Sequence, residues 1–245
     1  MATIQIKNIG PITDTGIIPL TSVMLVIGKQ SSGKSTFLKI LCFCRWMEKL
    51  IMVSDEEAIS QYTHNLKFLK SMKQFHRFND SYFSSASSIR YEGDTITITM
   101  ENILSDVKIL RKPEFETVRY NTKLSFIPSE RNLVSVIRNI DQSYRSAESD
   151  VLFNYIFEWG EAKDSYTAEH PKRLSFTDNI EYINDGRNDL VRLINENKMI
   201  PVYYASSGVQ SAMPLDVMAD YFTGLVGKNA SVSKHDLANT LARYL

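Results

Sequence analysis

The sequence predicts an α/β fold with an antiparallel portion, and three observations favour it. Short strand-like apolar runs alternate with helix-period segments along the 245 residues. A glycine-rich loop joins one such run to one such helix. Strand-like runs separated by turn residues indicate hairpins. The length admits one large domain or two small ones. The chain contains no internal repeat and no low-complexity tract.

The first 49 residues contain the clearest elements. Residues 4–7 and 16–20 are strand-like and flank a turn-rich stretch at 8–11. Residues 23–27 are an uninterrupted apolar run, which predicts a strand buried on both faces of a sheet. Residues 33–49 have helical periodicity, and the face predicted to be apolar consists of Phe37, Leu38, Leu41 and Cys44.

The middle of the chain predicts a helical arm followed by short strands. Residues 55–78 are acidic at the start and basic towards the end, as the helix dipole favours, so we expect an arm over about 55–80. Residues 81–88 are a serine-rich break. Residues 89–91 and 95–100 alternate around a turn, which predicts a hairpin with one solvated face. Residues 124–127 predict another buried strand, which Pro128 ends.

The last part of the chain predicts helices around a second group of strands. Residues 132–160 have a helical pattern with a polar interruption near 141–150. Strand character returns over residues 174–183 and 190–202, with a turn at 195–197. A further helix is expected from about residue 210 to 225.

Composition and charge exclude several classes of protein. Twenty-eight basic residues balance twenty-eight acidic ones, so no whole-protein electrostatic case exists for nucleic acid or a membrane, although a local patch stays open. No apolar run approaches the ~20 residues of a membrane helix. Cys42 and Cys44 are one residue apart, so a bridge between them would be strained. With no signal-like N-terminus, we expect a reduced, cytoplasmic protein without a membrane partner.

The strongest motif is a phosphate-binding loop between the run at 23–27 and the helix that follows. Residues 28–35 match Gly-x-x-x-x-Gly-Lys-(Ser/Thr) in full. The glycines let the backbone turn N–H groups towards phosphates, and the helix adds its positive end. The lysine is expected at the β- and γ-phosphates, and the Ser35 hydroxyl at Mg²⁺. The residues expected to bind the nucleotide are Gly28, Lys29, Gln30, Ser31, Ser32, Gly33, Lys34, Ser35 and Thr36.

A second glycine-containing element lies near the end of the chain. Residues 206–211 read Ser-Ser-Gly-Val-Gln-Ser, follow a pair of strand-like runs and open an apolar helix. A helix N-terminus with hydroxyl groups and a glycine is suited to receive phosphate oxygens.

This element resembles the signature motif of ABC-type ATPases, most closely in the SMC-like and OLD-like branch of bacterial AAA ATP-binding proteins. The segment Ile-Lys-Asn-Ile-Gly-Pro-Ile at 6–12 and Phe-Ile-Pro-Ser-Glu-Arg at 126–131 resemble further parts of that branch. The resemblance covers the chain in order and implies that residues 1–245 form a single domain with a P-loop NTPase fold of ABC type. This fold would have antiparallel N-terminal strands, a helical arm and a signature region at 203–225. It also implies that Ser207, Gly208 and Gln210 contact ATP held by a second subunit, so that two chains enclose two nucleotides.

The chain departs from that family at several positions. Val209 stands where the commonest signature has glycine, and no glutamine is found at the presumed Q-loop, so Ser129 or Glu130 would replace it. No apolar strand ending in Asp-Glu follows the signature, and His235 lies in a polar tail. We therefore expect the chain to bind Mg-ATP, with Lys34 and Glu130 as the catalytic candidates. Hydrolysis is expected to need a carboxylate from outside this sequence.

The resemblance implies a motor or sensor ATPase in DNA maintenance or anti-phage defence. It would act as a homodimer or hetero-oligomer, with nucleic acid or a nuclease as a possible partner. Two alternatives stay open. One is a nucleotide-gated scaffold without hydrolysis, and the other is a small-molecule or nucleotide kinase that works as a monomer.

Three weaker signals each have a structural alternative. Basic residues among aromatic ones at 67–78 suit a nucleic-acid face, but a solvated helix over an apolar stripe explains them better. The cysteines and histidines lack the spacing of a zinc site. Glu130 with Arg131 suits either a nucleotide site or a surface ion pair, and Lys7 with Asn8 either an adenine border or a turn.

Overall fold

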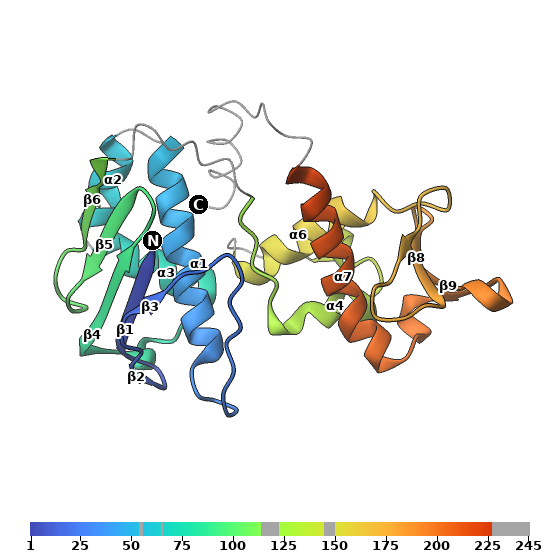
Figure 1. Ribbon diagram of the computed structural model, residues 1–245, viewed down its shortest axis with the longest axis horizontal. Coiled ribbons are helices and arrows are strands. Elements are labelled where there is room, and N and C mark those ends of the chain that lie inside the picture. The colour runs from blue at the N-terminus through green and yellow to red at the C-terminus, as the bar shows by residue number, and fades with distance from the viewer. Residues whose placement is uncertain (54–55, 65, 114–122, 145–149, 227–245) are drawn as a thin grey trace. The chain divides into compact units, whose positions relative to one another are not determined.

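The computed structural model describes residues 1–53, 56–64, 66–113, 123–144 and 150–226, which fall into two compact units (Figure 1). The N-terminal unit takes in the described residues up to Leu124, and the C-terminal unit those from Ser125 onward. Each unit combines helices with a sheet, which confirms the predicted α/β class. Every strand pair among the described residues is antiparallel.

The N-terminal unit is built on a six-stranded sheet. Its order is β2-β1-β4-β5-β6, with β3 also paired to β1. The predicted strand at 4–7 and the hairpin at 89–100 are confirmed, and Tyr91 pairs with Ile98 in that hairpin. The strands are β1 (Thr3–Ile9), β2 (Ile12–Asp14), β3 (Ile18–Pro19), β4 (Phe83–Glu92), β5 (Ile96–Met100) and β6 (Lys108–Arg111).

The predicted serine-rich break at 81–88 is wrong, because β4 begins at Phe83. The hydroxyl group of Ser87 stabilises the strand through hydrogen bonds to the backbone. The buried Ser87 hydroxyl accepts a hydrogen bond from the Ser84 N–H at 2.8 Å and donates one to the Asn8 carbonyl. Asn8 has a φ of 51° and lies where the register between β1 and β4 shifts. Asn8 and Ser87 therefore stabilise a β-bulge, and the turn alternative for Asn8 fits this position.

One long helix, α1 (Lys34–Val53), covers a face of this sheet (Figure 1). The helix predicted over 33–49 is confirmed. Of the four side chains predicted for its apolar face, Phe37 and Cys44 are buried, but Leu38 is 41% exposed and Leu41 half-buried. The buried face continues at helical spacing through Ile40, Phe43, Met47, Leu50 and Ile51.

A buried carboxylate ties α1 to the β4–β5 hairpin. The side chain of Glu48 is fully buried. Its oxygens accept hydrogen bonds from the Tyr91 hydroxyl at 2.5 Å, the Thr95 N–H at 2.7 Å and the Thr95 hydroxyl at 2.9 Å. Arg45 lies 3.3 Å from the same carboxylate and 2.9 Å from Asp94. The charge is thus fully hydrogen-bonded, as a buried charge must be.

The predicted arm consists of two helices, α2 (Glu56–Thr63) and α3 (Lys67–His76). Leu66 precedes α3 with a φ of 58°, which breaks the helical path. Asp55, the first acidic residue of the predicted arm, lies outside the described residues. On α3, Phe68, Leu69, Met72 and His76 are buried against the core.

The predicted strand at residues 23–27 is wrong. The segment is extended but belongs to neither sheet. Val23, Leu25 and Ile27 are 87%, 85% and 81% exposed, whereas Met24 and Val26 pack against the core. An apolar run predicts burial, but burial on two faces needs neighbouring strands, and none among the described residues pairs with it.

The C-terminal unit packs helices against a four-stranded sheet of order β10-β9-β8-β7. Its core includes Trp159 and Tyr182, whose ring centroids are 5.7 Å apart. The strands predicted at 190–202, with their turn at 195–197, are confirmed by β9 and β10, whereas of the strand predicted at 174–183 only residues 180–183 belong to a strand. The predicted helical region 132–160 contains three helices, and residues 145–149 of its polar interruption lie outside the described residues. The elements are α4 (Leu133–Val136), α5 (Ile140–Ser143), α6 (Val151–Lys163), β7 (Lys172–Arg173), β8 (Ile180–Asn184), β9 (Asp189–Leu193), β10 (Lys198–Pro201) and α7 (Ser207–Val226).

The strand predicted at residues 124–127 is wrong. Residues 123–128 form no strand, and they lead into a short 3-10 helix, η3 (Ser129–Asn132). Among the described residues, no strand pairs with residues 124–127. Instead, the Ser125 hydroxyl donates a hydrogen bond of 2.5 Å to Glu158 of α6.

Candidate functional site

The phosphate loop predicted at residues 28–35 lies directly before α1. Ser31 and Gly33 have φ values of 60° and 93°, so the chain reverses within the loop. Gly33 is buried against β2, and a Cβ atom there would lie 2.6 Å from Cγ1 of Ile12. A Cβ atom at Gly28 would lie 2.9 Å from the Ser32 hydroxyl oxygen. Close packing against Ile12 and the positive φ therefore both favour glycine at position 33, whereas at Gly28 the exposed Ser32 side chain could rotate away from a Cβ atom.

The loop presents backbone amides without acceptors. Within the described part of the chain, the N–H groups of Gln30, Ser31 and Gly33 donate no hydrogen bond. The first turn of α1 adds further N–H groups, since the opening residues of a helix have no intrahelical acceptor. Unsatisfied amides beside the positive end of a 20-residue helix form an environment that favours an anion.

The motif lysine reaches back over this loop. Nζ of Lys34 donates hydrogen bonds to the carbonyl oxygens of Gly28 at 2.9 Å and Lys29 at 2.5 Å. An ammonium group has three N–H donors, so one remains for a further acceptor. The Ser35 side chain is exposed and accessible to a ligand, whereas Thr36 is 6% exposed and faces the core. Lys29, Gln30 and Ser32 are exposed.

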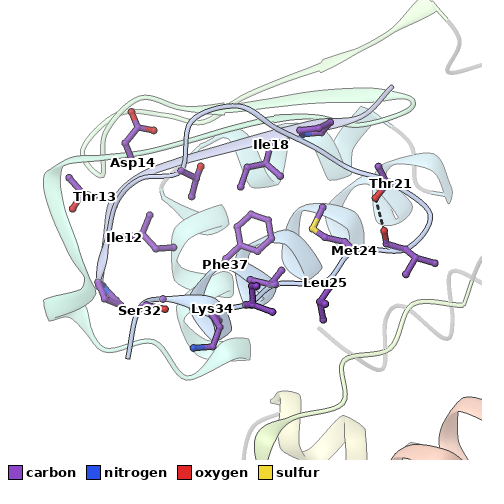
Figure 2. A pocket seen from close by; sticks show the side chains of 17 residues that line it. Ile12, Thr13, Asp14, Ile18, Thr21, Met24, Leu25, Ser32, Lys34 and Phe37 are labelled. Atoms are coloured by element: carbon purple, nitrogen blue, oxygen red, sulfur yellow. Dashed lines mark hydrogen bonds between the residues drawn. The ribbon is translucent and has the colours of Figure 1, made fainter. Parts of the chain in front are cut away.

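A cleft of about 770 Å³ adjoins the loop. Residues 11–19 form one wall, residues 21–27 form another, and Gly33, Lys34 and Phe37 line it as well. Figure 2 shows Phe37 in the middle of the cleft, with Ile12 and Ile18 on the side of the first wall. Most of these side chains are apolar, and the polar ones include Asp14, Ser32 and Lys34.

The second predicted element lies in the C-terminal unit, at the start of α7. This helix begins at Ser207, three residues before the predicted start, so Ser207 and Gly208 form its exposed N-terminus. A Cβ atom at Gly208 would meet nothing within 4 Å. The Gln210 side chain is engaged elsewhere, because its Nε2 donates to the carbonyls of Val202 at 3.1 Å and Tyr203 at 2.8 Å. Ser207 and Gly208 are thus accessible, while the Gln210 side chain stabilises the turn at Val202 and Tyr203 that precedes α7.

Glu130 lies in the same unit, on η3 beside α7. The Ser129 hydroxyl donates to the Glu130 carboxylate at 2.8 Å. Nε of Arg131 donates to the Ser211 carbonyl at 3.1 Å, and the Arg131 carbonyl accepts from the Tyr155 hydroxyl at 2.8 Å. The structure therefore places Glu130 with the signature element and not within the unit that holds the phosphate loop.

One group near the signature element escaped the sequence analysis. The guanidinium of Arg138 stacks over the rings of Tyr203 and Tyr204, at 5.1 Å and 5.5 Å from their centroids. These rings are 47% and 65% exposed. The two adjacent tyrosines just before residues 206–211 were the only sequence signal for this cluster, because Arg138 lies 65 residues before Tyr203.

Two of the basic residues at 67–78 make contacts within their own unit, and Lys70 is exposed. Nζ of Lys67 lies over the Tyr62 ring at 4.7 Å, and Lys73 pairs with Asp80 at 2.9 Å. The aromatic side chain Phe68 is buried beneath them. These contacts fit the solvated helix over an apolar stripe.

Metal-ligating side chains do not cluster in the described residues, where no group of three or more His, Cys, Asp or Glu could hold an ion. Burial raises the pKa of the Cys44 thiol well above its usual range, so this cysteine stays a neutral core residue. A Mg²⁺ ion at Ser35 would take its other oxygens from phosphates and water, which Mg²⁺ commonly does.

The structure thus brings residues 28–36 together at the start of α1 and places Ser207, Gly208 and Glu130 in the other unit. No helix among the described residues is both long and apolar enough to cross a membrane. No family model, no curated protein and no solved structure matches the chain.

Proposed function

We propose that this chain binds Mg-ATP at residues 28–36. The observation that carries the proposal is a complete phosphate-loop motif whose amides lack acceptors, placed at the N-terminus of a long helix. The amides of Gln30, Ser31 and Gly33 would hold phosphate oxygens. These donors need no rearrangement of the fold, since the positive φ values of Ser31 and Gly33 are already set.

Lys34 provides the charge of the site. Two of its ammonium N–H groups are held by the carbonyls of Gly28 and Lys29, so the third would be directed to the β- and γ-phosphates. The Ser35 hydroxyl would be the protein ligand of Mg²⁺. When bound, Mg²⁺ neutralises phosphate charge and bridges β- and γ-oxygens.

Binding is tested by titrating ATP with Mg²⁺ into the folded chain in a calorimeter, using Lys34→Ala and the control Lys70→Ala. Lys70 is an exposed lysine on α3, so both variants lose one positive charge. A charge-assisted hydrogen bond contributes about 1.5–3 kcal/mol, so Lys34→Ala should weaken binding roughly 10- to 150-fold. Lys70→Ala should bind like the wild type. No heat at millimolar ATP with folded wild-type protein would contradict the proposal.

We further propose that ATP on one chain is contacted by Ser207 and Gly208 of a second chain. The exposed, uncrowded N-terminus of α7 supports this role, because Ser207 and Gly208 are accessible to a phosphate. The Val209 N–H is already engaged by the Ser206 hydroxyl at 3.4 Å, so the amides of Ser207 and Gly208 and the Ser207 hydroxyl would be the donors. The γ-phosphate would then hold two chains together only in the ATP state. Glu130, beside the same helix, would lie close to that phosphate as the candidate water-positioning carboxylate.

Light scattering coupled to gel filtration separates this arrangement from a monomeric kinase. At a low protein concentration, chosen so that the nucleotide-free chain is monomeric, the wild type should double its mass with Mg-ATP and return to a monomer when the nucleotide is removed. Ser207→Arg places a bulky side chain at the helix N-terminus and should abolish the ATP-dependent dimer. A wild type that binds ATP and stays monomeric would favour the kinase. ATP turnover by the wild type and by Glu130→Gln then tests the catalytic candidate.

A further inference from the structure

Residues 23–27 form the most exposed apolar segment next to the phosphate loop. Its side chains alternate, with Met24 and Val26 packed on the core and Val23, Leu25 and Ile27 more than 80% exposed. This alternation is that of a β-strand with one face on the core. The segment thus has the form of a strand, but it lies outside both sheets.

The backbone of this segment is also unpaired. Thr21 accounts for one contact, since its hydroxyl donates to the Val23 carbonyl at 2.7 Å (Figure 2). In the described residues, no N–H or C=O group of residues 24–27 takes part in a hydrogen bond. An extended backbone with free N–H and C=O groups is a template for another strand. A second β-strand can pair with the successive N–H and C=O groups of residues 24–27. We therefore expect the partner of this segment to be a β-strand.

The protections that usually block such pairing are missing. Native edge strands carry lysine, proline or an inward charge, or are covered by another element. Residues 21–28 contain neither a charged residue nor proline. This segment also meets the composition of a pairing-prone run, with β-branched and apolar residues and no charge.

We propose that two copies of this chain pair through residues 21–29 as antiparallel strands, centred on Leu25. In this register Val23 lies opposite Ile27 of the second copy, and Met24 lies opposite Val26. The two Lys29 side chains each lie opposite Thr21, so no like charges face each other. Such an interface is isologous and closes as a dimer with two-fold symmetry.

The pairing covers part of the exposed face as well as the backbone. Side chains directly opposite in an antiparallel pair have Cβ atoms about 4.5–5.5 Å apart. Val23, Leu25 and Ile27 of the two copies therefore form one row of apolar pairs. Because the strand ends at Gly28, its pairing also fixes the chain at the start of the phosphate loop.

The test measures mass and cross-linking without nucleotide, so that it is independent of ATP binding. In light scattering, the wild type should have twice the monomer mass at high concentration. Leu25→Lys sets two like charges opposite each other and should be monomeric. The control Leu104→Lys alters a leucine that is 78% exposed elsewhere in the unit and should dimerise like the wild type. Because Leu25 is 85% exposed, circular dichroism of Leu25→Lys should match the wild type.

A covalent experiment checks the register. Leu25→Cys should form a disulfide-linked dimer under mild oxidation, because the two side chains lie directly opposite. The wild type, with Cys42 and Cys44 only, and Leu104→Cys should not. A wild type that stays monomeric at its highest soluble concentration, or a Leu25→Lys variant that dimerises equally, would overturn the proposal. Amides 24–27 that resist hydrogen exchange in a monomer would also overturn it, because another strand would then occupy the site.

Discussion

The buried Glu48 carboxylate allows the sharpest stability prediction. Glu48→Ala removes the acceptor of the Tyr91 hydroxyl and of the Thr95 N–H and hydroxyl, all inside the core. A buried donor left without an acceptor costs about 1–3 kcal/mol. The Thr95 hydroxyl can rotate to another partner, so two donors remain unsatisfied and contribute about 2–6 kcal/mol. Loss of the contact with Arg45 adds to this, while the carboxylate no longer has to be desolvated.

We therefore expect Glu48→Ala to lower the free energy of unfolding by about 3–5 kcal/mol, as for the removal of one partner from a buried ion pair. Glu48→Gln keeps one oxygen for Thr95 and should cost less. Glu92 lies in the same hairpin, pairs with Arg90 at 2.8 Å and has a side chain that is 36% exposed. Glu92→Ala should therefore change stability by no more than about 1 kcal/mol.

The assay is unfolding in urea, with hydrogen exchange of the amides of α1 and β5 as the readout. Because these amides belong to the N-terminal unit, the readout reports on that unit alone. Glu48→Ala should shift the unfolding midpoint to lower urea, with Glu48→Gln between it and the wild type. A Glu48→Ala variant within about 1 kcal/mol of the wild type would refute the reasoning. So would a Glu92→Ala variant that is equally destabilised.

Two further perturbations test the loop and the core. Gly33→Ala combines a positive φ with a Cβ atom 2.6 Å from Ile12, so it should cost more stability than Gly186→Ala, which has a φ of 85° and no neighbour within 4 Å. Equal losses in urea unfolding would contradict this. Burial, with a smaller contribution from Lys39, lowers the pKa of His76 to about 3, below its unfolded value of about 6.5. Stability should therefore be full above pH 6.5 and fall towards pH 3 by up to about 1.4 kcal/mol per pH unit. His76→Phe should reduce this slope in urea unfolding at several pH values, and an unchanged slope would contradict the assignment.

Local sequence patterns were sufficient to predict those elements whose structure depends on neighbouring residues in the sequence. The helix after the phosphate loop and the β4–β5 hairpin follow from periodicity and turn residues, and both are confirmed. The motif at residues 28–35 can be identified from its residue types and spacing, and its binding of phosphate stays a prediction. The α1 face was less well predicted, because Leu38 is exposed although its spacing suits the core.

Prediction was wrong where the structure depends on a distant segment. Residues 23–27 have the composition of a central strand, but no neighbouring strand pairs with them among the described residues. The serines before residue 88 were interpreted as a break, yet Ser87 satisfies the backbone of a bulge whose other side is Asn8. Similarly, nothing local shows that Gln210 bonds to two carbonyls of the preceding turn. Sequence composition does not specify such long-range partners.

The hydrogen bond from Arg131 to Ser211 has a mechanical consequence. Arg131 is bonded through its side chain to the first turns of α7 and through its carbonyl to Tyr155 on α6. We therefore expect a displacement of the first turns of α7 to move Arg131 and its neighbour Glu130. A ligand that binds at the N-terminus of α7 and displaces this helix would therefore also change the position of the Glu130 carboxylate.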